Sequence, residues 1–366
     1  MKETILNEAL VPEYTLPYDN AFNSLEGWEA LKPEIIKLFE DHFFGKIPRQ
    51  KAGMSFSMIS FVNNALSDKA TKKTIRFNFD EAPSYSFDIN LYEPKAQDAN
   101  GVFLRLNFFD EVTADERIIR WTETKNRAYE KMIDEGFACA TVVYSAILPD
   151  NADAFPTAYE KIALASGDEV PLEETGAISC WAWGIMRMCD YFSQESQYRN
   201  VPLFVFGHSR LGKTALWAGA NDKRLSYIIS NESGCGGAAI SRRCYGETIE
   251  KMNDTFPHWL CKKAKDYNDN ETKLPIDQHL LIALIAPRAV YVASAEGDQW
   301  SDPMGEFLGA KHANSAYKLY GCYNKLEQFP KLHSPVGDNL RYHIRAGVHD
   351  ETDYDWNEYL DLAKNI

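Results

Sequence analysis

The feature that most constrains the fold is a short strand that leads through a glycine-flanked serine turn into a helix. The apolar run 201–206 predicts a buried strand, and a helical pattern begins at Thr214. Between them the chain reads Gly207-His-Ser-Arg-Leu-Gly-Lys213. Such a turn is typical of a nucleophile elbow, in which the sharp bend exposes the serine hydroxyl at the top of a parallel sheet. The helix that follows directs free N–H groups toward the place where an oxyanion would form.

The turn differs in one position from the usual pattern Gly-x-Ser-x-Gly. Leu211 stands where the second glycine is expected, and Gly212 follows one residue late. An ordinary strand–turn–helix in which Ser209 caps the helix would show a similar local pattern. The elbow alone leaves both interpretations open, so the rest of the chain has to distinguish them.

Composition excludes several classes of protein. The chain has 366 residues, 45% of them apolar, and a formal charge of −14, which is unsuitable for binding nucleic acid or an anionic membrane. Its seven cysteines are widely spaced and include no C-x-x-C pair, so we expect neither a disulfide framework nor a zinc site. The glycines between 234 and 237 precede no Lys-Ser/Thr pair, so a phosphate loop is not expected. We therefore predict no metal and no cofactor.

The amino-terminal residues do not resemble a signal peptide, because they contain no continuous apolar stretch. We expect a cytoplasmic location on this ground, although a secreted or periplasmic chain whose signal had been removed would look the same. No apolar run approaches membrane-spanning length.

The chain is predicted to form a single α/β-hydrolase domain over residues 1–366. Residues 1–54 are expected to be an extension packed on it, with one helix near 28–43, and residues 234–275 an insertion near the active site. Three antiparallel strands are predicted at 55–62, 74–79 and 86–92. Strands and helices then alternate, with strands at 102–108, 137–144, 201–206, 225–230, 289–295 and 340–344, and helices at 117–135, 176–192, 214–220, 277–285 and 355–364. This alternation predicts a three-layer sandwich with a mainly parallel central sheet.

In an α/β-hydrolase the catalytic residues follow the chain order serine, acid, histidine. Glu232 ends the strand after Ser209, Asp298 ends the strand 289–295, and His349 lies just beyond the last predicted strand. A serine hydroxyl needs a base within hydrogen-bond reach, and the imidazole needs a carboxylate to orient it. Either acid could serve, and we favour Asp298 because it follows the penultimate strand. The N–H of Arg210, next to the nucleophile, is the expected oxyanion donor.

These motifs resemble the glucuronoyl esterases of carbohydrate esterase family 15, in their bacterial form. The resemblance rests on Gly-x-Ser-Arg-x-Gly-Lys from Gly207, Glu-Ser-Gly-x-Gly-Gly from Glu232, and the late Asp-x-Trp and His349. In that family the late glycine is a regular feature. The resemblance implies a serine esterase that hydrolyses esters of (4-O-methyl)glucuronic acid, either between xylan and lignin alcohols or in small glucuronate esters.

The resemblance also implies a role for each matching residue. Glu232 matches the triad acid of fungal members, and Asp298 matches the triad acid of many bacterial ones. His208 replaces a cysteine that many members have, so the disulfide formed by that cysteine is not possible here. The remaining roles are Ser209 as nucleophile, His349 as base, an oxyanion-stabilising guanidinium on Arg210, and contacts to the uronic-acid ring from Lys213, Glu247 and Trp300.

Two other functions remain compatible with the sequence. A deacetylase of xylan or of another carbohydrate would share the triad, but it would not need Lys213, Glu247 and Trp300 together. A catalytically silent carbohydrate-binding protein could keep the hydrolase scaffold, although the intact serine, acids and histidine argue against it. The expected partner is a small-molecule or oligosaccharide uronate ester, and the oligomeric state is left open.

Overall fold

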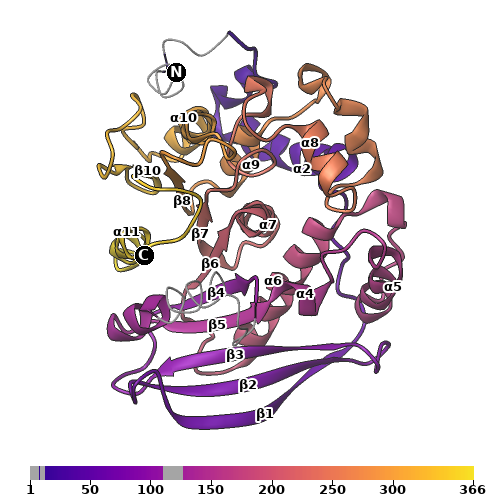
Figure 1. Ribbon diagram of the computed structural model, residues 1–366, viewed down its shortest axis with the longest axis vertical. Helices are drawn as coiled ribbons and strands as arrows, with labels where there is room; N and C mark the ends of the chain where they lie inside the picture. The colour runs from indigo at the N-terminus through magenta and orange to yellow at the C-terminus, as the bar shows by residue number, and fades with distance from the viewer. Residues whose placement is uncertain (1–7, 9–12, 110–126) are drawn as a thin grey trace.

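The computed structural model describes residue 8, residues 13–109 and residues 127–366. These residues form a ten-stranded sheet with helices on both faces (Figure 1). One end of the sheet is the antiparallel set β1 (Met54–Ala65), β2 (Ala70–Phe79) and β3 (Ser86–Pro94). The antiparallel entry predicted from the sequence is therefore confirmed.

The parallel part of the sheet carries the elbow. The strand order is β1-β2-β3-β5-β4-β6-β7-β8-β10-β9, in which β3 pairs with β5 antiparallel and the strands from β5 to β10 run parallel. Antiparallel β9 closes the far edge. The bounds are β4 Val102–Asn107, β5 Ala138–Val143, β6 Leu203–His208, β7 Leu225–Asn231, β8 Ala289–Ala295, β9 Val336–Gly337 and β10 Leu340–Arg345.

Two hydrophobic clusters cover the two faces of the sheet. The larger contains the buried side chains of α6, α7, α9 and α10, and the smaller contains α11 together with residues 128–133. Among the described residues no helix is long and apolar enough to cross a membrane. The helices are α2 Leu25–His42, α4 Tyr144–Ile147, α5 Phe155–Ser166, α6 Ala177–Gln194, α7 Arg210–Asn221, α8 Ile249–Thr255, α9 Gln278–Ile285, α10 Pro303–Leu319 and α11 Asp353–Ala363, with short 3-10 turns at Asp19–Asn23, Leu172–Glu174, Ser241–Arg243, Lys262–Tyr267 and Glu271–Lys273.

The sequence prediction missed the helices α4, α5, α8 and α10. Most of α10 is buried, and it contains Gly305 and Gly309, so its sequence has neither an amphipathic pattern nor a high helix propensity. A side chain at Gly309 would overlap the carbonyl oxygen of Ala238, which shows that close packing selects glycine there. Of the helix predicted at 117–135, residues 127–134 are helical, and residues 117–126 lie outside the described residues.

The elbow is built by close backbone approach. Ser209 has φ +58° and ψ −127°, outside the helical region, and α7 begins at the next residue. A side chain at Gly207 would overlap the Leu211 carbonyl, and a Cβ at Gly212 would lie 2.9 Å from that of Ser233. The late glycine therefore has a structural reason, because α7 approaches the loop after β7 at position 212 rather than at position 211.

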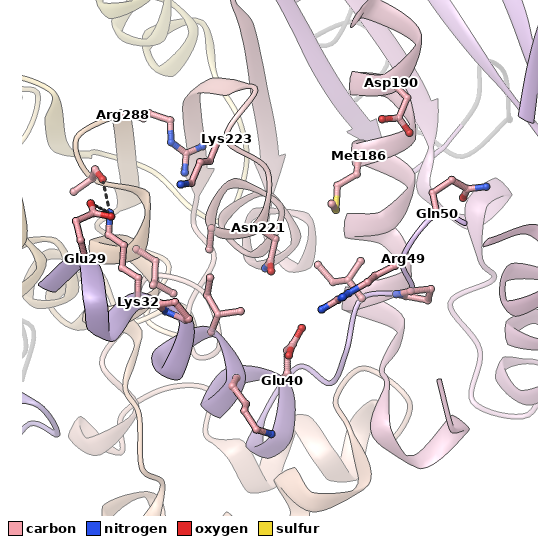
Figure 2. Close-up of a pocket in the computed structure, with 18 of the residues that line it drawn as sticks. Glu29, Lys32, Glu40, Arg49, Gln50, Met186, Asp190, Asn221, Lys223 and Arg288 are labelled. Atoms are coloured by element: carbon pink, nitrogen blue, oxygen red, sulfur yellow. Dashed lines mark hydrogen bonds and ion pairs between the residues drawn. The ribbon is translucent and has the colours of Figure 1, made fainter. Parts of the chain in front are cut away.

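A cavity of about 1020 Å³ lies at the other end of α7 from Ser209. Figure 2 shows side chains from α2, α6, the end of α7 and the segments that follow α2 and α7 around it, among them Glu40, Arg49, Asn221 and Lys223. Among the described residues that line it there is no serine, cysteine or histidine. The cavity therefore lacks the hydroxyl and imidazole that acyl transfer needs, and the elbow rather than this cavity locates the chemistry.

The packing at Gly207 predicts a severe effect of Gly207→Ala. The added methyl group meets backbone rather than a movable side chain, so β6 and α7 must separate. We expect the free energy of unfolding to fall by about 1–3 kcal/mol and ester turnover to fall with it, measured by urea unfolding and an ester assay. The control is Gly53→Ala, where the methyl meets only the Asp80 carboxylate at the end of a flexible side chain. Equal effects of the two substitutions would contradict this account.

Candidate active site

Ser209 lies where the parallel sheet ends and α7 begins. Its N–H donates to the carbonyl of Asn231, the last residue of β7, at 2.9 Å. This bond fixes the elbow against the neighbouring strand. Arg210 is the first helical residue, so its N–H has no acceptor within the helix and can face a developing oxyanion.

His349 contacts both predicted acids through the same ring nitrogen. Its Nδ1 is 2.6 Å from Oδ2 of Asp298 and 3.2 Å from Oε2 of Glu232. The three residues come from loops after three strands, β10, β8 and β7, which end at the same edge of the sheet. With Nδ1 held by carboxylates, Nε2 is the nitrogen that can accept a proton from a nucleophile.

The position of His208 shows that the base, His349, lies close to the nucleophile. His208 directly precedes Ser209, and its ring centroid lies 4.4 Å from that of His349. No hydrogen bond joins the Ser209 hydroxyl to another described residue. Catalytic contacts of this kind are often long until substrate binds, so the spacing remains compatible with acyl transfer.

The two acids have different electrostatic surroundings. Burial opposes the charge of Asp298, but the hydrogen bond and positive charge of His349, together with hydrogen bonds from Ser301, outweigh burial and lower the pKa of Asp298 below the ordinary value. Burial dominates at Glu232 and raises its pKa to about 7, although His349 and Arg345 favour its ionised form. Together the two carboxylates outweigh the burial of the imidazole and raise the pKa of His349. Asp298 is thus the permanently charged partner of the base.

Glu232 also holds the loop that carries His349. Its Oε1 accepts from Arg345 Nη2 at 2.5 Å, and its Oε2 accepts from the N–H of Asp350 at 2.9 Å. Arg345 in turn donates to the carbonyls of Val348 and Asp350, at 3.2 and 2.5 Å. Sequence reasoning missed Arg345, because an arginine that ends a strand gives no sign of its partners.

Asn231 is a second residue that sequence reasoning missed. Its side-chain amide contacts His208 Nδ1 at 2.7 Å and the carbonyl of Asp350 at 3.1 Å, while Tyr359 donates to its Oδ1 at 2.7 Å. Burial lowers the pKa of His208 well below its usual value, so this ring is neutral. Asn231 therefore connects the elbow, the loop that carries His349 and the helix α11 through hydrogen bonds.

Arg210 is held in place by Asp150, another residue that the sequence analysis did not single out. One guanidinium nitrogen forms an ion pair with Asp150, and the group lies over Trp259 and Phe256 at 4.6 and 4.9 Å. His258 and Trp259 also hydrogen-bond to Asp150. These hydrogen bonds outweigh burial and lower the pKa of Asp150, which keeps the carboxylate charged. Arg210 is thus fixed beside the nucleophile with its charge balanced.

Lys213 and Glu247 form a buried pair beneath the site. Lys213 Nζ donates to Glu247 Oε2 at 2.5 Å and to the carbonyls of Ser233 and Cys235 at 2.7 and 2.5 Å. All three N–H groups of the ammonium are therefore used within the protein. Contact of Lys213 with a sugar hydroxyl, which the resemblance implies, would require an exchange of one of these bonds and stays a prediction.

Trp300 lies at the surface beside this pair. Its side chain is 51% exposed, and its carbonyl accepts from the N–H of Glu247 at 2.8 Å. The ammonium of Lys251 lies 5.3 Å from its ring centre. An exposed indole joined to the Lys213–Glu247 pair is suited to cover a sugar ring, as the predicted role requires.

Among the described residues, one group of side chains has the spacing of metal ligands, and it lies in the triad region. His208, Glu232 and His349 each offer a ligand atom within 4.8 Å of the others. The carboxylate of Glu232, however, already binds Arg345 and the N–H of Asp350, and Nδ1 of His349 is bound by Asp298. These contacts suit a proton-transfer site better than a metal site.

Comparisons with known proteins agree with this geometry. The family model of fungal glucuronyl esterases matches residues 171–321. A solved glucuronoyl esterase from Solibacter usitatus is 39% identical, with a TM-score of 0.88 over 98% of this chain and 99% of the other. Carbohydrate esterase MZ0003, from an unknown prokaryotic organism, is 37% identical over 98% of this chain and 90% of its own length.

The chain belongs to the glucuronoyl esterases of carbohydrate esterase family 15. The family and the α/β-hydrolase fold predicted from the sequence are thereby confirmed. A fungal member, the 4-O-methyl-glucuronoyl methylesterase of Podospora anserina, is 31% identical over 45% of this chain and 35% of its own length. Similarity to the bacterial members thus extends over almost the whole chain, whereas similarity to this fungal member covers less than half of it.

The geometry predicts unequal effects of neutralising the two acids. Asp298→Asn should lower kcat at least about a hundredfold, but by less than the roughly 10⁴-fold loss seen when a lone triad acid is neutralised, because Glu232 still touches Nδ1. Glu232→Gln should cost less, and the double variant should be worse than either. The measurement is steady-state ester turnover. If Asp298→Asn kept nearly normal turnover and Glu232→Gln were inactive, Glu232 rather than Asp298 would be the main triad acid.

The raised pKa of His349 predicts a shift in the pH profile. Turnover requires the neutral imidazole, and both nearby carboxylates stabilise the charged one. Glu232→Gln removes one negative charge, so the acid limb of kcat/KM should move to lower pH. Glu81→Gln, at an exposed turn, is the control for a general loss of charge and should leave the limb unchanged. If the acid limb of Glu232→Gln stayed at the same pH or moved to higher pH, the charge of Glu232 would not be raising the pKa of His349.

Proposed function

We propose that this chain is a serine esterase that hydrolyses esters formed by the carboxyl group of glucuronic acid or 4-O-methylglucuronic acid. The observation that carries the proposal is the pair of contacts from His349 Nδ1 to Asp298 and Glu232, at 2.6 and 3.2 Å, beside the strained Ser209. This arrangement supplies an oriented base next to a half-buried serine hydroxyl, which is what acyl transfer needs. The substrate class follows from the family to which the chain belongs.

The reaction begins with attack by Ser209. Its Oγ forms a bond to the ester carbonyl carbon while His349 Nε2 takes the hydroxyl proton. The negative charge that develops on the carbonyl oxygen is met by the N–H of Arg210 at the start of α7 and by the nearby guanidinium. Collapse of the tetrahedral species breaks the ester bond, and the imidazolium returns its proton to the leaving alcohol.

Water completes the cycle. His349 takes a proton from a water molecule, whose oxygen attacks the carbonyl carbon of the glucuronoyl ester on Ser209. The bond between that carbon and Ser209 Oγ then breaks, the imidazolium returns its proton to Oγ, and the uronic acid is released. In both steps the positive charge that forms on the imidazole is stabilised by Asp298. Glu232 contributes to the same stabilisation when it is ionised, and in either state it holds the loop through Asp350.

Recognition of the uronic acid is assigned to the surface beside the nucleophile. Lys213 follows Ser209 by one helical turn and is 2% exposed, Glu247 is 7% exposed, and Trp300 is open to solvent. We propose that Trp300 covers the sugar ring and that the buried pair sets the position of the loop against which the ring rests.

The test compares benzyl glucuronate with an acetylated xylo-oligosaccharide. A glucuronoyl esterase should turn over the first with a clearly higher kcat/KM, whereas a carbohydrate deacetylase should prefer the second. Ser209→Ala should lower both activities by roughly 10⁶-fold, because no other group forms the acyl-enzyme. Preference for the acetylated substrate would overturn the substrate assignment, and turnover by Ser209→Ala would overturn the mechanism.

Trp300→Ala gives a clean test of the sugar contact, because this side chain is half exposed and its loss leaves no buried charge. We expect kcat/KM for the glucuronate ester to fall about two- to tenfold, since stacked aromatic contacts contribute roughly 0.5–1.5 kcal/mol. Hydrolysis of nitrophenyl acetate should be much less affected. The control is Tyr323→Ala, which is 75% exposed and lies beyond the far end of α10.

Lys213→Ala and Glu247→Ala should also lower kcat/KM more for the glucuronate ester than for nitrophenyl acetate. Each also leaves its partner as an unpaired buried charge, which costs about 3–5 kcal/mol, so folding is measured alongside. Equal losses on the glucuronate ester and on the acetate would mean that these residues support the fold or the triad rather than the sugar.

A further inference from the structure

The edge strand β1 is unusually apolar for an exposed position. It forms one end of the ten-stranded sheet, the lower border of the molecule in Figure 1, so its outer side has no partner strand among the described residues. Its sequence, MSFSMISFVNNA, has neither a charged residue nor a proline. In the whole chain 25% of the residues are charged. An edge strand of this kind lacks the features that normally prevent pairing with another strand.

The middle of β1 exposes four large apolar side chains. Met58 is 62% exposed, Ile59 46%, Phe61 52% and Val62 45%. Nearer the start of the strand, Phe56 packs against the body of the protein through Phe77 and Tyr191, but the residues from Ser57 to Asn64 are exposed on both faces of the strand. Side chains on both faces are therefore available for contact with another chain.

The opposite edge of the sheet is protected. It is formed by β9, which consists only of Val336 and Gly337. A two-residue strand offers too few hydrogen-bonding groups to nucleate pairing. The contrast between the edges excludes a continuous head-to-tail sheet, in which β1 of one molecule would pair with β9 of the next.

Two register shifts modify β1 without protecting it. The pairing with β2 shifts between Met58 and Ser60 and again between Val62 and Ala65. Such bulges increase local twist, and edges often use them to avoid pairing. Here they add no charge, and Ser60 to Val62 still pair regularly with Thr74 to Lys72. A regular stretch with exposed apolar side chains therefore remains between the shifts.

We propose that β1 pairs with β1 of a second copy of this chain, antiparallel across a two-fold axis. An antiparallel edge is self-complementary, and a two-fold pairing closes after two molecules. The chain as a whole has a formal charge of −14, so two copies repel over most of their surfaces. Because β1 has no charge, its two-fold pairing brings no like charges face to face along the strand. The dimer would have one continuous sheet through both molecules.

Dimerisation at this edge leaves the active site open. Five strand spacings separate β1 from β6, which carries the elbow, and at 4.7–4.9 Å each this amounts to about 24 Å. The proposal is therefore independent of the proposed function, and ester turnover per chain should not change with association.

The first test is sedimentation velocity between about 1 and 100 µM, comparing the natural chain with Phe61→Lys. The natural chain should form dimers, and a lysine in the contact should raise the dimer dissociation constant at least about tenfold, as loss of a buried anchor does. Leu164→Lys is the matched control, because Leu164 is 58% exposed on α5 and should leave association unchanged. Ester turnover per chain should be alike in all three proteins, and so should thermal unfolding at a concentration low enough for all three to be monomeric.

The second test locates the contact in the natural chain. Amide hydrogen exchange is followed at low and high protein concentration, and the amides of Ile59 to Val62 should become more protected at the high concentration. A natural chain that stays monomeric at 100 µM would overturn the proposal. So would a dimer in which β1 gains no protection, or one that Phe61→Lys leaves intact. Binding of a monomer to lipid vesicles through β1 would assign the strand to a membrane instead, and would also overturn it.

Discussion

The active site depends on one buried guanidinium. Arg345 ends β10, is 2% exposed, and is bound by Glu232 at 2.5 Å and Asp355 at 2.8 Å. It also donates to two carbonyls of the loop that carries His349. The end of β7, the start of α11 and the catalytic loop are thereby joined through a single cation. Loss of one partner of a buried pair costs about 3–5 kcal/mol, so this network fixes the loop rigidly. His349 is therefore held in a fixed position although its side chain is 38% exposed.

The nucleophile depends on backbone packing rather than on charge. Ser209 adopts a positive φ, which costs free energy for a residue with a side chain, and the bond from its N–H to Asn231 together with the contact of Gly207 and Leu211 holds it there. Asn231 also contacts His208, so the strained serine and the ring beside the base share one support. Two rigid units, one around Arg345 and one around the elbow, meet where His208 and His349 face each other.

The sequence was sufficient for those parts of the molecule that are encoded locally. The elbow, the antiparallel entry and the order of Ser209, the acids and His349 follow from strand patterns and from residue types at strand ends. Contacts between distant segments could not be predicted in this way. Asp150 supports Arg210 across sixty positions of sequence, and Arg345 reaches back to Glu232 over more than a hundred. The helix α10 was missed because burial on most sides removes the amphipathic signal, and the exposure of β1 was missed because its alternation resembles that of a half-buried strand.

Asp298 and Glu232 both contact Nδ1 of His349, and their other partners explain why the site contains two acids. Asp298 has the shorter contact and remains ionised, so it can stabilise the imidazolium by itself. Glu232 has Arg345 and the N–H of Asp350 as further partners, which hold it within 3.2 Å of Nδ1 whether or not it contributes charge. The residue that supports the loop is thus already in position to act as the triad acid. The contacts of Arg345 and Asp350 with Glu232 hold this acid in place for the sake of the fold, independently of catalysis. The role of main triad acid could therefore pass from Asp298 after β8 to Glu232 after β7 without rebuilding the site.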